Sequence, residues 1–270
     1  RELSRMGTIM GVVPAIAPVL GGVMHEALGW RSVFVFCLVW GLGAILVVMF
    51  KLPETLKIRN EASISPLGIL RGFAGLAKHR AFLAYMALLS LTYGGLFSYI
   101  SASSFILQGV YGLRELAFGF AFSIGVFGYI AGTIASQRIV PRRGLEAAMR
   151  LGVACLSIAG VAMLAAVLFG PGHPAEIIAP MVVYLFGVGL VMPQAMASAL
   201  MPFPDRAGTA SSFLGLVQML TGAAIGILVG HALGASALPL PIAIAATGVL
   251  TFLIFHGSAA VRARAAAAGR

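Results

Sequence analysis

Charged residues are scarce throughout this 270-residue chain. Lys, Arg, Asp and Glu make up 10% of it, against about 25% in an ordinary soluble domain, while 60% of its residues are hydrophobic. So little charge beside so much apolar surface excludes an ordinary soluble protein. The composition instead indicates a chain that lies in a lipid bilayer.

Acidic residues are rarer still, at 8 Asp and Glu against 18 Lys and Arg, and none falls in the middle of a long apolar run. Those that flank the runs are Glu26, Glu115, Glu146, Glu176 and Asp205. A charge at the centre of a membrane helix costs about 2.5–3.5 kcal/mol, so a retained one usually has a function. The apolar runs therefore contain no carboxylate that is suited to carry protons.

Patterns for metal, nucleotide and disulfide chemistry are also missing. Cys37 and Cys155 lie in separate apolar runs, where we expect reduced packing residues. No Cys/His spacing indicates a metal site, and no G-x-x-x-x-G-K-[ST] loop indicates ATP as an energy source. Gly187 and Gly189 lack the third glycine of a dinucleotide fingerprint. We therefore expect no cofactor, no metal and no catalytic residues.

Eight apolar segments are long enough to cross the hydrocarbon core, which takes about 20 residues of helix. They are Met6–Met24, Ser32–Phe50, Phe82–Leu107, Ala117–Ala135, Ala148–Phe169, Ile177–Met201, Ala207–Leu233 and Pro241–Phe255. Because these runs are continuous rather than alternating, they predict helices and not the strands of a barrel. The predicted fold class is an all-α membrane protein with eight transmembrane helices.

The basic residues lie between these segments. They do not gather on one face, so the net charge of +10 does not indicate nucleic-acid binding. If Arg1 is cytoplasmic, all of the 18 basic residues except Arg31 and Arg114 fall on the cytoplasmic side. Loops rich in Lys and Arg remain on that side of a membrane. The asymmetry supports the number of spans and predicts a cytoplasmic C-terminus.

The longest polar stretch is the loop from Lys51 to Arg80, which divides two spans from six. Four of its apolar residues recur at helical spacing: Leu67, Leu70, Phe73 and Ala77. This spacing predicts a short helix on the cytoplasmic membrane surface. A flexible linker is the alternative.

The first span is rich in residues that bend helices or let them approach closely: Gly7, Gly11, Pro14, Pro18, Gly21 and Gly22. A proline inside a helix removes a hydrogen bond and kinks it, and glycine admits a neighbouring backbone. Two prolines four residues apart, followed by a Gly-Gly pair, predict a specific bend.

This run resembles a family motif. Residues Ala15–Gly22, followed by Gly29–Phe34, resemble the fifth-helix antiporter motif of the major facilitator superfamily. Further stretches resemble its bicyclomycin/chloramphenicol-resistance (Bcr/CflA) drug–proton antiporters: Leu52–Leu56, Ser104–Gln108, Arg138–Gly144 (a basic loop in the family), Pro193–Leu200 and Ala207–Gln218. The combination covers essentially the whole chain. Ala17 and Gln194 depart from the usual glycine and asparagine.

The resemblance implies a twelve-helix transporter of two six-helix halves, of which this chain holds helices five to twelve. Residues 1–50 would belong to the N-terminal half, 51–80 to a cytoplasmic central loop, 81–257 to the C-terminal half and 258–270 to a cytoplasmic tail. The implied activity is export of small amphipathic drugs in exchange for protons across the bacterial cytoplasmic (inner) membrane, by a monomer. Helices one to four, with the acidic residue expected for coupling, have no counterpart, so we expect the fragment to be inactive alone.

Polar and aromatic residues line one side of the third span at steps of three and four: Ser90, Tyr93, Phe97, Ser101, Ser104 and Gln108. Polar groups that faced lipid would lose hydrogen bonds, so this side is expected to meet protein or water. The sixth span repeats the pattern around Pro193, where a bend is expected, with Tyr184, Gly187, Gln194 and Ser198.

We hypothesise a substrate site formed by Tyr93, Phe97, Ser101, Ser104, Gln108, Gln194 and Gln218, and a conformational motif of Pro14, Pro18, Gly21 and Gly22. Interhelical hydrogen bonding is the alternative role for the polar residues. Two other functions stay open. A metabolite importer would share the fold but would favour charged groups in its pocket, and a transport-dead fragment would act as a membrane scaffold.

Overall fold

The computed structural model describes residues 16–17, 20–52, 66–234 and 236–268. Within these ranges the chain forms helices and short connections, and it forms no β-strand. The predicted all-α fold is confirmed. Residues 20–28 are helical. The elements that follow are α2 (Arg31–Lys51), α3 (Pro66–Leu76), α4 (Arg80–Ser104), a π-helix (Phe105–Val110), α5 (Glu115–Phe169), α6 (Ala175–Leu200), a 3₁₀ turn (Pro204–Arg206), α7 (Ala207–Ala232), α8 (Pro239–Gly257) and α9 (Ala259–Ala268).

In the part of the chain that the structure describes, six helices are long and apolar enough to cross a membrane: α2, α4 with its π-helical extension, α5, α6, α7 with the preceding turn, and α8. At 55 residues, α5 would be about 80 Å long if straight, more than twice the thickness of the hydrocarbon core. It contains both the fourth and the fifth predicted span. The first predicted span lies largely outside the described residues.

The chain reverses within α5 at Gly144, whose φ of 80° and ψ of 172° are not helical. Tyr111, just before α5, and Gly170, just after it, both approach Glu176, so the two ends of α5 lie at the same end of the molecule. We call residues 115–143 the first arm and residues 145–169 the second arm.

The expectation of a basic loop at Arg138–Gly144 is wrong, because the chain stays helical up to Arg143. One glycine with positive φ is sufficient to reverse the chain, since glycine adopts this conformation without a steric cost. The arginines before it therefore extend the first arm.

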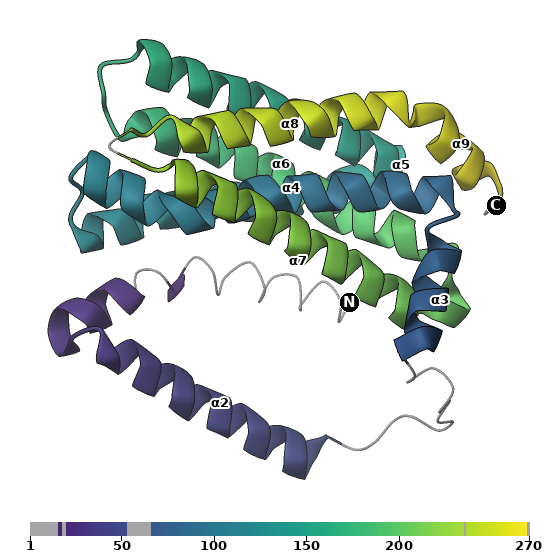
Figure 1. The fold of residues 1–270 in the computed structure, drawn as a ribbon, viewed down its shortest axis with the longest axis horizontal. Helices are drawn as coiled ribbons and strands as arrows, with labels where there is room; N and C mark the ends of the chain where they lie inside the picture. The colour runs from purple at the N-terminus through teal and green to yellow at the C-terminus, as the bar shows by residue number, and fades with distance from the viewer. Residues whose placement is uncertain (1–15, 18–19, 53–65, 235, 269–270) are drawn as a thin grey trace.

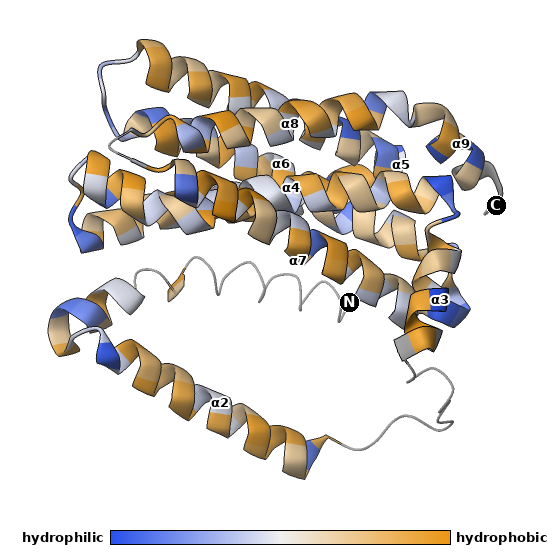
Figure 2. Cartoon of the chain, viewed as in Figure 1, coloured by the Kyte–Doolittle hydropathy of each residue, from blue (hydrophilic) through white to orange (hydrophobic). Residues whose placement is uncertain are grey.

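Helices α4 to α8 pack side by side in one bundle, whereas α2 lies apart from it (Figure 1). No residue of α2 is buried. Along the helices the residues are mostly hydrophobic, and hydrophilic residues gather at the helix ends (Figure 2). This distribution is the one that a bilayer requires of helices that cross it.

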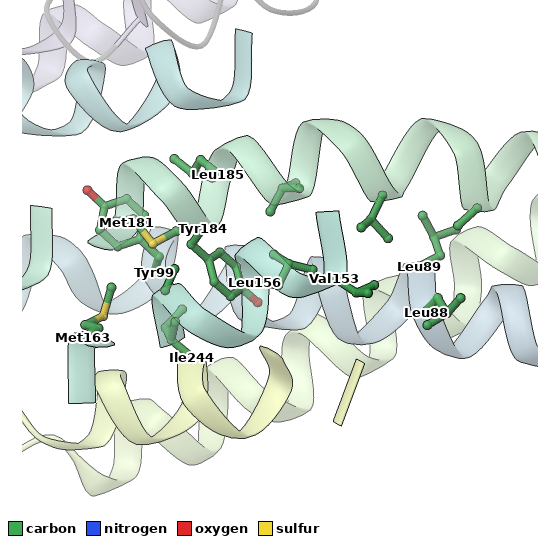
Figure 3. Close-up of a cluster of buried hydrophobic side chains, with 14 of the residues drawn as sticks. Leu88, Leu89, Tyr99, Val153, Leu156, Met163, Met181, Tyr184, Leu185 and Ile244 are labelled. Atoms are coloured by element: carbon green, nitrogen blue, oxygen red, sulfur yellow. The ribbon is translucent and has the colours of Figure 1, made fainter. Parts of the chain in front are cut away.

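The core of the bundle lies where the second arm of α5 meets α4, α6 and α8 (Figure 3). Leu156 of the second arm is fully buried, as are Leu88 of α4, Met181 and Tyr184 of α6, and Ile244 of α8. Lipid tails are as apolar as these side chains, so the helices are held by close fit and dispersion rather than by exclusion of water.

Glycines bring the first arm of α5 into backbone contact with α6. A Cβ atom on Gly128 would lie 2.2 Å from the carbonyl oxygen of Val182, and one on Gly132 would lie 2.2 Å from that of Phe186. On the α6 side, a Cβ on Gly189 would lie 2.6 Å from the carbonyl oxygen of Tyr129. Only glycine permits this approach, which positions α6 on α5.

The central loop contains a short helix, α3, where the apolar spacing predicted one. Some of its apolar residues pack against α7, and others are exposed. Phe73 stacks on Phe213 of α7, with ring centroids 4.7 Å apart, whereas Leu67 and Leu70 are exposed. One side of α3 is therefore docked on α7, and its position on the membrane surface stays a prediction.

We expect Gly132→Ala to destabilise the protein, because the new methyl group would overlap the Phe186 carbonyl and force α5 and α6 apart. Overpacking of this kind costs about 1–3 kcal/mol. Gly230→Ala is the matched control, since a Cβ there has nothing within 4 Å. Unfolding free energies in detergent give the comparison, and equal stability of the two variants would contradict the backbone contact.

Candidate substrate site

The aromatic residues of the third predicted span lie on α4 and face α7. The Tyr93 and Phe97 rings are stacked, with centroids 5.8 Å apart and planes 27° from parallel. Both side chains are half-buried, and Ser101, one turn further along, is exposed. Three of the predicted residues are thus brought together on one surface.

This surface of α4 packs against two glycines of α7, Gly222 and Gly226. A Cβ on Gly222 would lie 2.8 Å from the Tyr93 ring. A Cβ on Gly226 would lie 3.2 Å from the Phe97 ring and 3.3 Å from Ser101 Oγ. The glycines at 222 and 226 therefore have a packing role, and both aromatic side chains remain partly exposed.

Met219 of α7 borders the aromatic pair, and Gln218 lies one turn before Gly222 on the same helix. The Tyr93 hydroxyl donates a weak hydrogen bond of 3.5 Å to Sδ of Met219. Gln218, the neighbouring predicted residue, is half-buried. A methionine, an amide and two aromatic rings offer a neutral surface that adapts to ligand shape.

The other predicted residues of α4 lie where the helix widens. Gln108 lies within the π-helix, and its Nε2 donates a 2.7 Å hydrogen bond to Oγ of Ser104, which is exposed. Single π-helical turns occur often at functional sites. Ser90, at the opposite end of the predicted face, is buried, so it does not share the open surface.

Gln194 lies apart from this group. It is buried on α6, and its Nε2 donates to Oγ of Ser136 on the first arm of α5. Tyr184 is also buried, with its hydroxyl 3.2 Å from Oγ1 of Thr247 on α8. Both residues join neighbouring helices, and α6 continues through Pro193 without interruption.

The described part of the predicted conformational motif lies against α5. A Cβ on Gly22 would lie 3.9 Å from the carbonyl oxygen of Glu115, and nothing approaches Gly21 within 4 Å. His25 Nδ1 is 3.1 Å from a carboxylate oxygen of the same Glu115. Pro14 and Pro18 lie outside the described residues. The first span therefore touches the bundle at the end of the molecule where α5 begins.

The chain matches the sequence profile of the Major Facilitator Superfamily over residues 1–227. It belongs to this superfamily. It is 30% identical to a bicyclomycin resistance protein homolog of Haemophilus influenzae, over 95% of this chain and 64% of that protein. It is 26% identical to multidrug resistance protein D of Escherichia coli, over 80% of this chain and 53% of that protein. It is 26% identical to a chloramphenicol resistance protein of Pseudomonas aeruginosa, over 77% of this chain and 48% of that protein.

Membership of the superfamily confirms the predicted kinship and identifies the chain as part of a transporter family rather than an enzyme family. The chain spans less than two-thirds of the length of these curated relatives. The multi-pass membrane location is likewise supported by its membrane-length helices.

In the described part of this superfamily member, the charged groups lie toward the ends of the membrane-length helices, with α5 taken as two arms, and in the segments outside them. At one end, Glu176 accepts hydrogen bonds from the backbone N–H groups of Gly172 and His173 and from the Tyr111 hydroxyl. Burial and this neighbouring carboxylate raise the pKa of Tyr111 to about 12, so its hydroxyl keeps the proton that it donates. The described residues include no cluster of three metal-ligating side chains.

At the other end, an ion pair joins residues that no sequence motif connects. Arg262 of α9 is buried and forms an ion pair with Glu146, at the start of the second arm of α5. The sequence predicts for Arg262 only a charge of the cytoplasmic tail, because nothing in its local sequence distinguishes a buried arginine from an exposed one.

A double-mutant cycle tests the Gln194–Ser136 hydrogen bond. We expect Gln194→Leu and Ser136→Ala to show a coupling free energy of about 0.6 kcal/mol, the average for polar contacts between membrane helices. Gln137→Leu is the control partner, since Gln137 is exposed beside Ser136. The free energy of unfolding in detergent is measured for each variant. Additive effects for both pairs would contradict a stabilising hydrogen bond between Gln194 and Ser136.

Proposed function

We propose that this chain is part of a multidrug exporter that moves small amphipathic drugs out of the bacterial cell in exchange for protons. The observation that carries the proposal is the similarity, along most of the chain, to proteins named for resistance to bicyclomycin, to chloramphenicol and to multiple drugs. Pro14 and Pro18 would bend the first span beside Gly21 and Gly22, as in the antiporter motif that this run resembles.

The surface between α4 and α7 supports an amphipathic substrate. Tyr93 and Phe97 offer stacking, and Ser101 and Gln218 offer hydrogen bonds. Among the described residues, no Asp, Glu, Lys, Arg or His lies in the middle of a span. Neutral groups of this kind suit drugs with apolar bodies and few polar atoms. Ser104 and Gln108 would extend the site toward the end of α4, while Gln194 would position the facing part of α6.

Transport would follow from rocking one half of the protein against the other around this site. The contact of Gly22 and His25 with Glu115 is placed to close one end of the interface between the halves. One proton charge that crosses about 100 mV releases about 2.3 kcal/mol. At about 1.4 kcal/mol per decade, this sustains a drug gradient of roughly fifty-fold.

The proton-carrying group would belong to another part of the transporter. Coupling requires a residue that gains and loses a proton while it is exposed alternately to the two sides, and intramembrane acids usually serve. We therefore propose that this chain supplies two helices of an N-terminal half (1–50), a cytoplasmic central loop (51–80), the C-terminal half (81–257) and a cytoplasmic tail (258–270). The whole protein would be a monomer in the cytoplasmic (inner) membrane.

Two other functions compete with export. A metabolite importer would use the same fold, but the neutral α4–α7 surface gives no anchor for a charged metabolite. A membrane scaffold without transport activity is the second alternative, and α2, which has no buried residue, would then bind another membrane protein.

The orientation prediction follows from the basic residues at the end of the bundle that carries α3 and α9. Single cysteines at Ala62 and at Pro174, in a background without Cys37 and Cys155, should react with impermeant maleimide from opposite sides. We expect Pro174→Cys to be labelled on intact cells and Ala62→Cys only after the membrane is opened. Labelling of both on intact cells would refute the topology.

Ser101→Leu should weaken drug export by the full-length transporter about five-fold, because loss of one hydrogen bond to the substrate costs about 1 kcal/mol. Export is measured as accumulation of a fluorescent drug at equal protein level. Ile100→Leu is the control, since Ile100 is exposed beside Ser101 but carries no polar group. Unchanged export in both variants would assign Ser101 to packing.

The isolated 270-residue chain should not exchange drugs for protons. Reconstituted in vesicles with an imposed pH gradient, it is expected to give no drug-dependent proton flux, whereas the Haemophilus influenzae relative gives one. The relative also tests the proposed activity itself, because absence of drug-dependent flux from it would argue against proton-coupled export. Equal flux from both would contradict this prediction and would point to a dimer in which two copies of the chain complement each other.

A further inference from the structure

A pocket of about 450 Å³ lies between the second arm of α5, α8 and α9. It is at the end of the bundle that also carries α3 and the C-terminus (Figure 1). Two alanines of α9, Ala259 and Ala263, line it together with five larger residues: Glu146, Arg150, Phe255, His256 and Arg262. None of these residues belongs to the α4–α7 surface.

One wall of the pocket is formed by an arginine whose three guanidinium nitrogens all donate hydrogen bonds within the protein. Arg262 is 2% exposed, and its Nε and Nη2 donate to the two carboxylate oxygens of Glu146 at 2.9 and 3.2 Å. Its Nη1 donates to the Phe255 carbonyl and to Oγ of Ser258, and its guanidinium carbon lies 4.0 Å from the centre of the Phe255 ring. This arginine therefore holds α9 on α8 and α5, and its charge is balanced by Glu146.

Arg150 is a second cation in the same pocket and has no such partner among the described residues. It lies one turn beyond Glu146, is exposed, and makes no hydrogen bond or ion pair with another described residue. Glu146 is the one carboxylate of the lining and is already paired with Arg262, so two guanidinium groups against one carboxylate leave the pocket with a net positive charge. A free guanidinium with its planar set of donors is suited to bind a phosphate through two parallel hydrogen bonds.

Exposed apolar side chains continue from the pocket along the same two membrane helices. Leu151 follows Arg150 on α5, and Leu253 and Leu250 lie about one and two turns before His256 on α8. All three are exposed on helices long enough to cross the membrane, so we expect them to face lipid tails. A ligand with a phosphate and long hydrocarbon chains would contact both the cation and these leucines, whereas a free phosphate would contact only the cation.

We propose that this pocket binds an anionic phospholipid, with its phosphate on Arg150 and its acyl chains along the second arm of α5 and α8. Basic pockets between membrane helices at a helix end take anionic headgroups for the same reason. The bound lipid would bridge α5, α8 and α9. The proposal depends on neither drug export nor proton exchange, so its test is independent of theirs.

The test is lipid binding to the purified 270-residue chain, with bound lipids counted by native mass spectrometry. We expect phosphatidylglycerol to bind at least ten-fold more tightly than phosphatidylcholine with the same acyl chains. Arg150→Gln should weaken phosphatidylglycerol binding about ten-fold, the effect of one lost charged hydrogen-bond pair. Arg206→Gln is the matched control, because it removes the same charge from an exposed position outside the pocket.

A second pair of variants leaves the charges unchanged. Ala263→Phe should fill the pocket and also weaken phosphatidylglycerol binding, while Ala260→Phe, on an exposed position of α9 outside the lining, should not. The proposal would be overturned if Arg150→Gln and Arg206→Gln weakened phosphatidylglycerol binding equally. It would also be overturned if Arg150→Gln or Ala263→Phe left this binding unchanged. Displacement of phosphatidylglycerol by millimolar inorganic phosphate would also overturn it, since the site would then take the free anion.

Discussion

A backbone N–H or C=O group inside a bilayer has no water to bond, so it must find its partner within the protein. Helices meet this condition within each segment, and nearly every described residue of this chain lies in one. Once the helices exist, their contacts are decided by shape, because lipid tails compete equally for apolar side chains. The backbone contacts of Gly128 and Gly132 with α6 are the clearest result.

The same condition explains where polar groups lie. Several serine and threonine hydroxyls along the spans, such as those of Thr92, Ser98 and Thr251, donate to backbone carbonyls one turn back, and charged groups are left toward the helix ends. There they join segments that are distant in sequence: Tyr111 with Glu176 at one end and Arg262 with Glu146 at the other. The middle of the bundle is thereby left neutral, which suits the substrate surface that we propose.

Much of the fold could be predicted because apolar length and charge distribution are local properties of the sequence. The spans from Ser32 onward coincide with helices, as does the short helix of the central loop. The reversal at Gly144 was not predictable, since a helix and a basic loop share the composition of residues 138–143 and the difference lies in one backbone angle.

The candidate site was predictable only in part, for a similar reason. Helical periodicity placed Tyr93, Phe97 and Ser101 on one side of α4, and the structure brings them together. Periodicity does not say which neighbour each side faces. Gln194 has the same polar character, yet it meets Ser136, and the role of Arg262 depends on Glu146, which lies 116 residues away.

The reversal at Gly144 also bears on how the chain enters the membrane. Because a single residue joins the two arms, they form a helical hairpin, and at the end that contains Gly144 the two helices must stay adjacent. Arg138, Arg142 and Arg143 stand immediately before the closed end, where their charges resist crossing the bilayer. Translocation would therefore carry the two open ends, at Glu115 and Phe169, across together, so that the insertion machinery handles both spans in one step.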